Sequence, residues 1–195
     1  YALGTFYLWH YMGKNNAGVS TYLNAAGNVI ATQPLTTDQR IEGNAQPNII
    51  YGWTNTFVYK SFDFNFLIRG VAGNKILNAT LANLNNPADS KLQNIPRFTL
   101  GESFNDINGY LISDRFIESG SYLRLDNATL GYTIKPALQA IKSIRFYLSG
   151  DNLFVITKYK GIDPEINIGG LTPGIDNNNF YPKTRTFLLG LNASF

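Results

Sequence analysis

Residues Thr184–Phe195 read Thr-Arg-Thr-Phe-Leu-Leu-Gly-Leu-Asn-Ala-Ser-Phe. Apolar side chains occupy alternate positions of this stretch, and polar or small side chains lie mostly between them, as in a β-strand with one apolar face. An exposed apolar strand at the end of a soluble domain promotes aggregation, whereas a strand of a transmembrane β-barrel pairs on both sides and turns its apolar face to lipid. The stretch therefore predicts an outer-membrane β-barrel. Its apolar positions are Phe187, Leu189, Leu191, Ala193 and Phe195.

The composition fits a β-protein that is rich in turns and aromatic rings. Charged residues make up 15% of the chain, aromatic residues 14%, and 18 residues are glycine, which favours this class over an average soluble domain. No run of about 18 apolar residues is present, so a transmembrane helix is excluded. Cysteine is absent, which excludes disulfides and thiolate metal sites, and the scattered net charge of +3 predicts no nucleic-acid partner.

Two neighbouring stretches predict a β-hairpin. Apolar residues fall on odd positions in Ile49–Tyr59, with Asn55 as an interruption, and on even positions from Phe62 onward. A two-residue turn at Lys60-Ser61 explains this change of parity, because it places Tyr59 and Phe62 on the same face of the sheet.

Two more strands follow later in the chain. Ala128–Ile134 and Ile144–Leu148 both alternate with a two-residue period. Leu153–Ile156 is apolar on both parities, which leaves its register open and allows a β-bulge there.

The connections between these strands alternate between short and long. Lys60-Ser61 and Lys135–Lys142 are short, whereas Gly73–Gly120 and Lys158–Lys183 are long and rich in Asn, Gly and Pro. Outer-membrane barrels have short periplasmic turns and long extracellular loops, so the pattern predicts that the two long segments lie outside the cell. Within the first of them, the apolar spacing of Asn74–Leu84 predicts a short helix.

The aromatic stretch Gly4–Met12 leaves two interpretations open, because its alternation is poor. It is either a sixth strand or part of an extracellular loop that runs through Gly43. Even six strands do not close a barrel, since the smallest single-chain barrels have about eight. We therefore expect the chain to be an arc of a larger barrel, and a mature or truncated fragment, because it starts at Tyr1 without a signal peptide.

Several motifs stand out beyond the strand pattern. The longest is Arg115–Tyr132, which reads Arg-Phe-Ile-Glu-Ser-Gly-Ser-Tyr-Leu-Arg-Leu-Asp-Asn-Ala-Thr-Leu-Gly-Tyr. The others are Tyr59–Asp63, Gly70–Asn74, Ser149–Phe154, Lys158–Glu165 and Tyr181–Phe187. Together, and in this order, they strongly resemble the carboxyl-terminal region of the SusC/RagA-type TonB-dependent transporters of Bacteroidetes.

The resemblance implies an all-β fold. Residues 1–195 would form an arc of about five or six antiparallel strands in a transmembrane barrel of about 22 strands with long extracellular loops. It implies TonB-dependent uptake of oligosaccharides or peptides across the outer membrane, with a SusD-like surface lipoprotein as lid and lipid around the barrel. The amino-terminal plug of the family, which contacts the TonB complex, is absent from this sequence.

The last residues also resemble the signal that the barrel-assembly machinery recognises. Gly190, Ala193 and Phe195 stand at the matching positions, while Leu189 departs from the pattern, which favours a polar residue there. The alternative is that Phe195 is merely a lipid-facing ring at the membrane interface.

Catalytic chemistry has little support in the sequence. His10 is the only histidine and has no recognisable Ser or Asp partner, so we expect a polar interfacial residue rather than part of a triad. Asp163-Pro164-Glu165 reads as a turn that starts at Asp, rather than as an acid/base pair or a calcium site. We therefore predict no enzymatic activity, no cofactor and no metal, which disfavours an outer-membrane hydrolase.

Binding residues are harder to assign. Arg69, Arg145 and Asp151 are predicted to face the barrel lumen and to pair with one another or with the plug. Aromatic rings in the loops suit stacking on sugar rings, although they also suit contact with the lid or with other loops. These candidates for ligand or partner contact are Trp9, Tyr11, Phe116, Phe180 and Tyr181.

The sequence thus predicts an outer-membrane importer, with a soluble carbohydrate-binding β-sandwich as the alternative. One set of side chains separates the two. A barrel exposes them to lipid, whereas a sandwich buries them against a second sheet. They are Phe62, Phe64, Phe66 and Ile68.

Overall fold

The computed structural model describes residues 2–86, 91, 94–101, 106, 108–137, 140–166, 172–178 and 181–195. The chain divides into two compact units. We call Asn48–Ala72, Ser121–Lys158 and Pro182–Phe195 the sheet unit, and Tyr1–Pro47, Gly73–Gly120 and Tyr159–Tyr181 the loop unit. The two long connections expected from the sequence thus fold together with the first residues of the chain.

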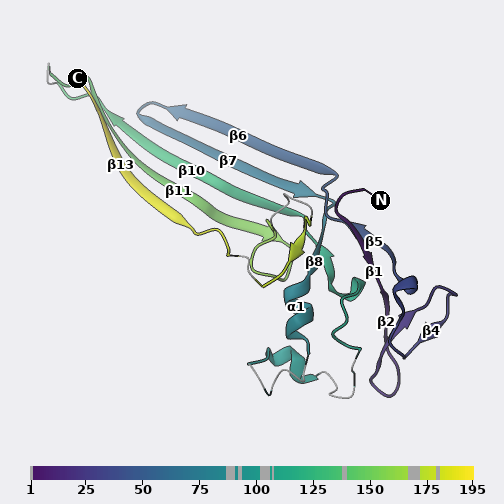
Figure 1. Cartoon of the computed structure of the whole chain (residues 1–195). Coiled ribbons are helices and arrows are strands. Elements are labelled where there is room, and N and C mark those ends of the chain that lie inside the picture. The colour runs from purple at the N-terminus through teal and green to yellow at the C-terminus, as the bar shows by residue number, and fades with distance from the viewer. Residues whose placement is uncertain are drawn as a thin grey trace. The chain divides into compact units, whose positions relative to one another are not determined.

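The sheet unit consists of one antiparallel sheet with the strand order β13-β11-β10-β7-β6 (Figure 1). Each strand has between 9 and 15 residues, which is long enough for a tilted strand to cross a bilayer, since about 9–11 residues suffice. The strands are β6 (Ile49–Tyr59), β7 (Phe62–Ala72), β10 (Tyr122–Ile134), β11 (Ser143–Thr157) and β13 (Thr186–Ser194).

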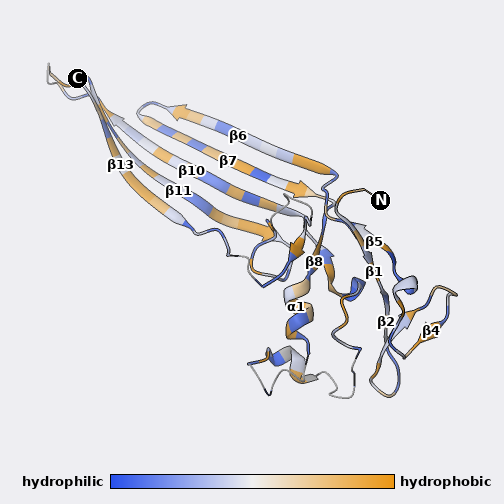
Figure 2. Ribbon diagram, viewed as in Figure 1, coloured by the Kyte–Doolittle hydropathy of each residue, from blue (hydrophilic) through white to orange (hydrophobic). Residues whose placement is uncertain are grey.

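The predicted hairpin is confirmed. Tyr59 and Phe62 are direct partners across the β6–β7 turn, so the apolar positions of both strands share one face. Apolar and polar residues alternate along β7 in Figure 2. Rings from neighbouring strands meet on the apolar face: the centroids of Trp53 and Phe66 are 5.1 Å apart, and those of Phe62 and Tyr132 are 4.7 Å apart. Such aromatic pairs add stability beyond the apolar area that they bury.

A bulge settles the register that the sequence left open at Leu153–Ile156. The pairing of β10 with β11 shifts between Leu125 and Asn127, and Phe154 is the partner of Leu125. Asn152, in the bulge on β11, has a positive φ of 51°. Because a one-residue slip would turn every following side chain to the other face, the bulge keeps Leu125 and Phe154 on the apolar side.

A side chain crosses a strand at one glycine of the sheet. The Tyr51 hydroxyl on β6 donates a hydrogen bond of 2.7 Å to the carbonyl oxygen of Tyr122 on β10. It reaches across Gly70 of the intervening β7, where a Cβ would lie 2.1 Å from that carbonyl oxygen and 2.5 Å from the tyrosine hydroxyl. The bridge therefore requires glycine at this position.

The described part of the loop unit contains three small sheets. The first pairs β1 (Thr5–Leu8) with β5 (Arg40–Asn44). The second joins β2 (His10–Lys14), β3 (Ser20–Leu23) and β4 (Val29–Ile30), and the third joins β12 (Ile175–Asp176), β8 (Lys75–Asn78) and β9 (Ile117–Ser119). Among the described residues of this unit, the helices are α1 (Ala79–Leu84) and the 3₁₀ turns η1 (Thr36–Asp38), η3 (Arg97–Gly101) and η4 (Asp114–Phe116).

The loop unit has its own apolar core. Buried side chains from β1, β8, α1 and η4 form one cluster, and Ile76, Tyr159 and Ile166 form a second. Asn78 caps α1, because its side-chain oxygen accepts the Leu81 N–H at 2.8 Å. The first cluster consists of Phe6, Leu8, Ala45, Leu77, Ala82 and Phe116.

The structure changes two of the predictions, for Asn74–Leu84 and for Gly4–Met12. The helix predicted over Asn74–Leu84 occupies only Ala79–Leu84, because Lys75–Asn78 forms the central strand of a small sheet. Gly4–Met12 contributes to β1 and β2, and both strands belong to the loop unit rather than to the five-stranded sheet. The stretch is therefore not a sixth strand of that sheet.

Among the described residues, no helix has the length and apolar character needed to cross a membrane.

We predict that Gly70→Ala lowers the stability of the folded protein by about 1–3 kcal/mol, because the new methyl group would force β7 and β10 apart and overpack the sheet. Gly52→Ala on β6 is the matched control, since a Cβ there would meet only one atom, at 4.0 Å. The measurement is the unfolding temperature of the complete protein in detergent. Equal temperatures for the two variants would contradict the predicted bridge.

Candidate functional site

The polar face of the sheet unit carries paired charges. Arg145 on β11 donates from Nε to Asp63 Oδ1 at 2.9 Å and from a terminal nitrogen to Asp63 Oδ2 at 2.5 Å. Asp63 lies on β7, so this bidentate pair crosses β10, where a Cβ on Gly131 would lie 2.3 Å from Asp63 Oδ1. The pair links two strands that do not pair with each other.

The other predicted lumen-facing residues are paired as well. Arg69 donates to Asp126 Oδ1 at 2.8 Å. Asp151 accepts a hydrogen bond of 2.6 Å from the side-chain amide of Asn127. Each of these residues and Arg145 therefore has a partner within the sheet, but the partners are Asp126, Asn127 and Asp63, so the three do not pair with one another as predicted.

The carboxyl-terminal strand pairs with β11 and presents its apolar positions on the apolar face. Leu189 is the partner of Leu148, and Leu191 of Phe146. Gly190 lies beneath a ring of β11, since a Cβ there would come within 2.2 Å of Tyr147. Phe195 follows the last residue of β13 and is 75% exposed.

The aromatic candidates in the loop unit occupy different environments. The Trp9 indole donates to the Leu35 carbonyl oxygen at 2.7 Å. Tyr11 packs edge-to-face on Tyr22 at 5.8 Å. Phe116 is only 2% exposed and belongs to the core, so its ring offers no free face for stacking.

Two further aromatic candidates come near the end of the loop unit. Tyr181 is 81% exposed, so its ring is free to contact a ligand or a partner. Phe180 lies outside the described residues.

The loop unit also contains a cavity of about 400 Å³, a volume within the range of small-molecule sites. Beside it, the Tyr159 hydroxyl hydrogen-bonds the Asp176 carboxylate. Burial, and secondarily this hydrogen bond, raises the pKa of the Tyr159 hydroxyl, so tyrosine remains the donor. The cavity is lined by Asn78, Thr80, Leu81, Leu84, Lys160, Gly161, Ile162, Asp176 and Asn178.

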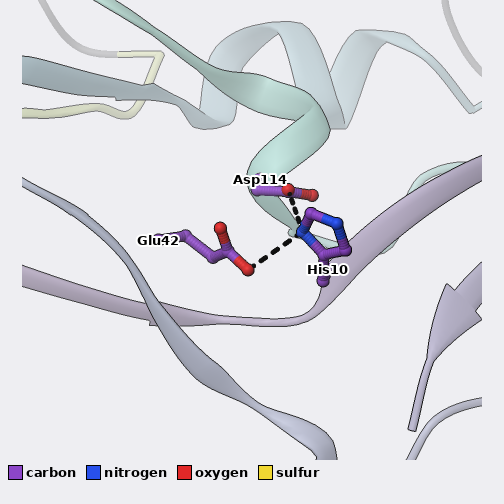
Figure 3. Close-up of side chains that lie close together, drawn as sticks. All are labelled: His10, Glu42 and Asp114. Atoms are coloured by element: carbon purple, nitrogen blue, oxygen red, sulfur yellow. Dashed lines mark hydrogen bonds and ion pairs between the residues drawn. The ribbon is translucent and has the colours of Figure 1, made fainter. Parts of the chain in front are cut away.

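The structure brings His10 next to two carboxylates that the sequence did not associate with it. Its Nδ1 lies 3.0 Å from Glu42 Oε1 and 2.6 Å from Asp114 Oδ2 (Figure 3). The three residues come from β2, β5 and η4, which are far apart in the sequence. No spacing signal connects them, so only the packing of the loop unit could reveal this group.

Comparisons with known proteins cover the whole chain. It is 33% identical over 206 residues to the TonB-dependent receptor SusC of Bacteroides thetaiotaomicron, and 30% identical over 222 residues to the TonB-dependent receptor P3 of Formosa agariphila. Its fold matches that of the RagAB peptide importer in the closed-closed state, with a TM-score of 0.77 and 22% identity over all of this chain and 25% of that chain. No family model matches the chain.

This chain belongs to the SusC/RagA type of TonB-dependent receptors. It spans only about a fifth of the length of its relatives, 20% of SusC and 22% of P3. The similarity to RagAB extends to the open-open state, with a TM-score of 0.74 and 23% identity over all of this chain and 24% of that chain.

The fold similarity to RagAB extends over the whole chain, so it includes the five-stranded sheet with its apolar face. The family and the all-β antiparallel fold expected from the motifs are thus confirmed. The roles of Gly190, Ala193 and Phe195 in assembly, and of the loop aromatics in binding, remain predictions.

For Phe195, we predict a larger effect on assembly than on stability. Phe195→Ala removes an exposed ring, so the folded receptor should lose at most about 2 kcal/mol of burial. If the ring is part of the assembly signal, the amount of complete receptor in the outer membrane should fall several-fold, while the inserted fraction melts at nearly the normal temperature.

The control is Leu191→Ala, which removes an apolar side chain from the middle of the same face. The measurements are membrane abundance and thermal melting of the purified receptor. Unchanged abundance together with a markedly lower melting temperature would show that Phe195 is only a packing residue.

Proposed function

We propose that this chain forms part of the wall and of the surface loops of an outer-membrane importer that takes up oligosaccharides or peptides with energy from the TonB complex. The observation that carries the proposal is the five-stranded sheet, which has an open apolar face and a polar face of paired charges. The sequence similarity of the chain to TonB-dependent receptors supports the same conclusion.

The apolar face argues against the soluble β-sandwich. Trp53 is 55% exposed, Phe57 54% and Phe62 51%, and the described part of the sheet unit contains one sheet and no second layer. Large aromatic side chains that remain this open along a whole sheet face mark a surface that meets lipid or another apolar partner. We assign this face to the outer-membrane lipid.

In the proposed mechanism, loops and a SusD-like lipoprotein lid capture the substrate, and movement of a plug opens a path along the polar wall. The plug and the segment that contacts TonB belong to the part of the receptor outside this chain. The relatives are named as receptors and importers. We accordingly propose that the chain has no catalytic role and that both substrate classes, oligosaccharides and peptides, remain candidates.

The direction of insertion follows from the connections. The turn at Lys60-Ser61, the connection Lys135–Lys142 and Phe195 all belong to one end of the sheet, because Thr133 N–H bonds to Ser61 and Lys142 N–H to Ser194. The other ends of the strands lead into the segments of the loop unit. Since long loops of such barrels are extracellular, we place the loop unit outside the cell.

Cysteine labelling tests this direction, because this chain has no native cysteine and the complete receptor without the added cysteine supplies the background. Asn178→Cys, in the loop unit, should react with a membrane-impermeant maleimide on intact cells. Ala137→Cys, in the exposed short connection, should react only after the outer membrane is permeabilised. The opposite pattern would invert the topology. A third cysteine at Ser90, which lies outside the described residues, should behave like that at Asn178.

We further propose that the cavity in the loop unit contacts substrate. The apolar residues Leu81 and Leu84 line it together with the polar residues Thr80 and Asn178 and the basic residue Lys160. This mixture of apolar and hydrogen-bonding groups suits a sugar ring or a short peptide, which both combine apolar and polar edges.

Filling the cavity should reduce uptake without affecting assembly. Ile162 lines the cavity and is 72% exposed, so Ile162→Trp adds bulk without disturbing a core. We expect at least a several-fold fall in uptake of the substrate at a normal outer-membrane level of receptor. Val29→Trp, at a position that is 55% exposed and outside the cavity, is the matched control. Equal uptake by both variants would remove the cavity from the substrate path.

A further inference from the structure

The group formed by His10, Glu42 and Asp114 is the candidate metal-ligand set found among the described residues. Their ligand atoms all lie within 4.8 Å of one another. We propose that these three side chains bind a divalent transition-metal ion, with Zn²⁺ as the favoured metal, and that the ion ties together three segments of the loop unit.

The distances from His10 Nδ1 to the two carboxylate oxygens fit a metal ion that replaces the proton between the imidazole and the carboxylates. One imidazole nitrogen carries at most one hydrogen, yet His10 Nδ1 faces Glu42 Oε1 at 3.0 Å and Asp114 Oδ2 at 2.6 Å. Ligands bound to Zn²⁺ at about 2.0–2.2 Å lie roughly 3–3.5 Å apart, so small side-chain movements suffice for all three to reach one ion. Figure 3 shows both carboxylates turned toward the same ring nitrogen.

A neighbouring backbone group orients one of the two carboxylates. The Tyr11 N–H donates to Asp114 Oδ1 at 2.7 Å, which leaves Oδ2 directed toward His10. Such outer-shell contacts are typical of metal sites, because they fix the orientation of the ligands. Arg40 Nε donates at 2.6 Å to Glu42 Oε1, the oxygen that also faces His10, so its guanidinium competes with a metal ion for this ligand atom.

Charge and burial favour a cation here. The side chains of Glu42 and Asp114 are only 14% and 19% exposed, and that of His10 is 29% exposed. When the imidazole is neutral, the two carboxylates carry two negative charges, and the guanidinium of Arg40 in contact with Glu42 offsets one of them. A divalent cation offsets the remaining charge, and a partly exposed histidine leaves room for water to complete the coordination.

The donor set selects the type of metal. Imidazole nitrogen with carboxylate oxygens suits Zn²⁺, whereas Ca²⁺ and Mg²⁺ prefer sites made entirely of oxygen ligands. Because the ligands come from β2, β5 and η4, a bound ion would cross-link these elements and hold Trp9 and Tyr11, the neighbours of His10, in place.

The test is zinc titration of the complete purified receptor in detergent, followed by competition with a chromophoric chelator. Because other parts of the receptor can also bind zinc, the readout is the difference between wild type and His10→Gln. We expect His10→Gln to lose one zinc equivalent or to weaken it at least about tenfold, since loss of even an outer-shell partner costs roughly 10–100-fold. Glu42→Gln and Asp114→Asn should behave alike.

Arg40→Gln is the matched control, since it removes a neighbouring charge and no ligand. It should bind zinc as tightly as wild type or more tightly, because the competing cation is gone. Retention of the folded form on gels of unheated samples checks each variant, and His10→Gln, at the most exposed ligand, suffices for the test. Equal zinc stoichiometry and affinity in wild type and His10→Gln, or displacement by an equal concentration of Ca²⁺, would overturn the proposal.

Discussion

Pairing of every backbone N–H and C=O group within the sheet is the constraint on which the rest of this structure depends. A strand that meets lipid has no water to satisfy its backbone, so neighbouring strands must lie parallel or antiparallel in strict register. That register alternates side chains between an apolar and a polar face, and a bulge such as the one at Asn152 corrects it where the sequence breaks the period. Both proposed contacts of the sheet, with lipid and with solute, follow from this alternation.

Strict register also explains three glycines of the sheet. A side chain can cross a neighbouring strand only where that strand carries no Cβ. Tyr51 lies over Gly70, the ion pair of Asp63 and Arg145 over Gly131, and Tyr147 over Gly190. For Gly190, this packing role is a physical reason for glycine that is independent of any assembly signal. The loop unit is stabilised differently. A small apolar core, rather than long ladders of backbone hydrogen bonds, holds its short strands together.

Much of the sheet could be predicted from local pattern. The β6–β7 hairpin followed from a change of parity across Lys60-Ser61, since a two-residue turn permits one arrangement of faces. The loop unit could be predicted only in outline. Lys75–Asn78 looked helical because Leu77 continues the helical spacing of Leu81 and Leu84, and its pairing with β9 and β12 decided for a strand. Phe116 looked like a loop aromatic, and its burial depended on Phe6 and Leu77, which are remote in sequence.

The sequence by itself determined the family and the sheet, because a two-residue period and ordered motifs are properties of contiguous residues. The tertiary structure alone decided the partners of the charged and polar side chains. Arg145 pairs with Asp63 across an intervening strand. His10 lies beside Glu42 and Asp114, which come from two other segments of the loop unit. Such contacts depend on how distant segments pack, and no spacing along the chain encodes that distance.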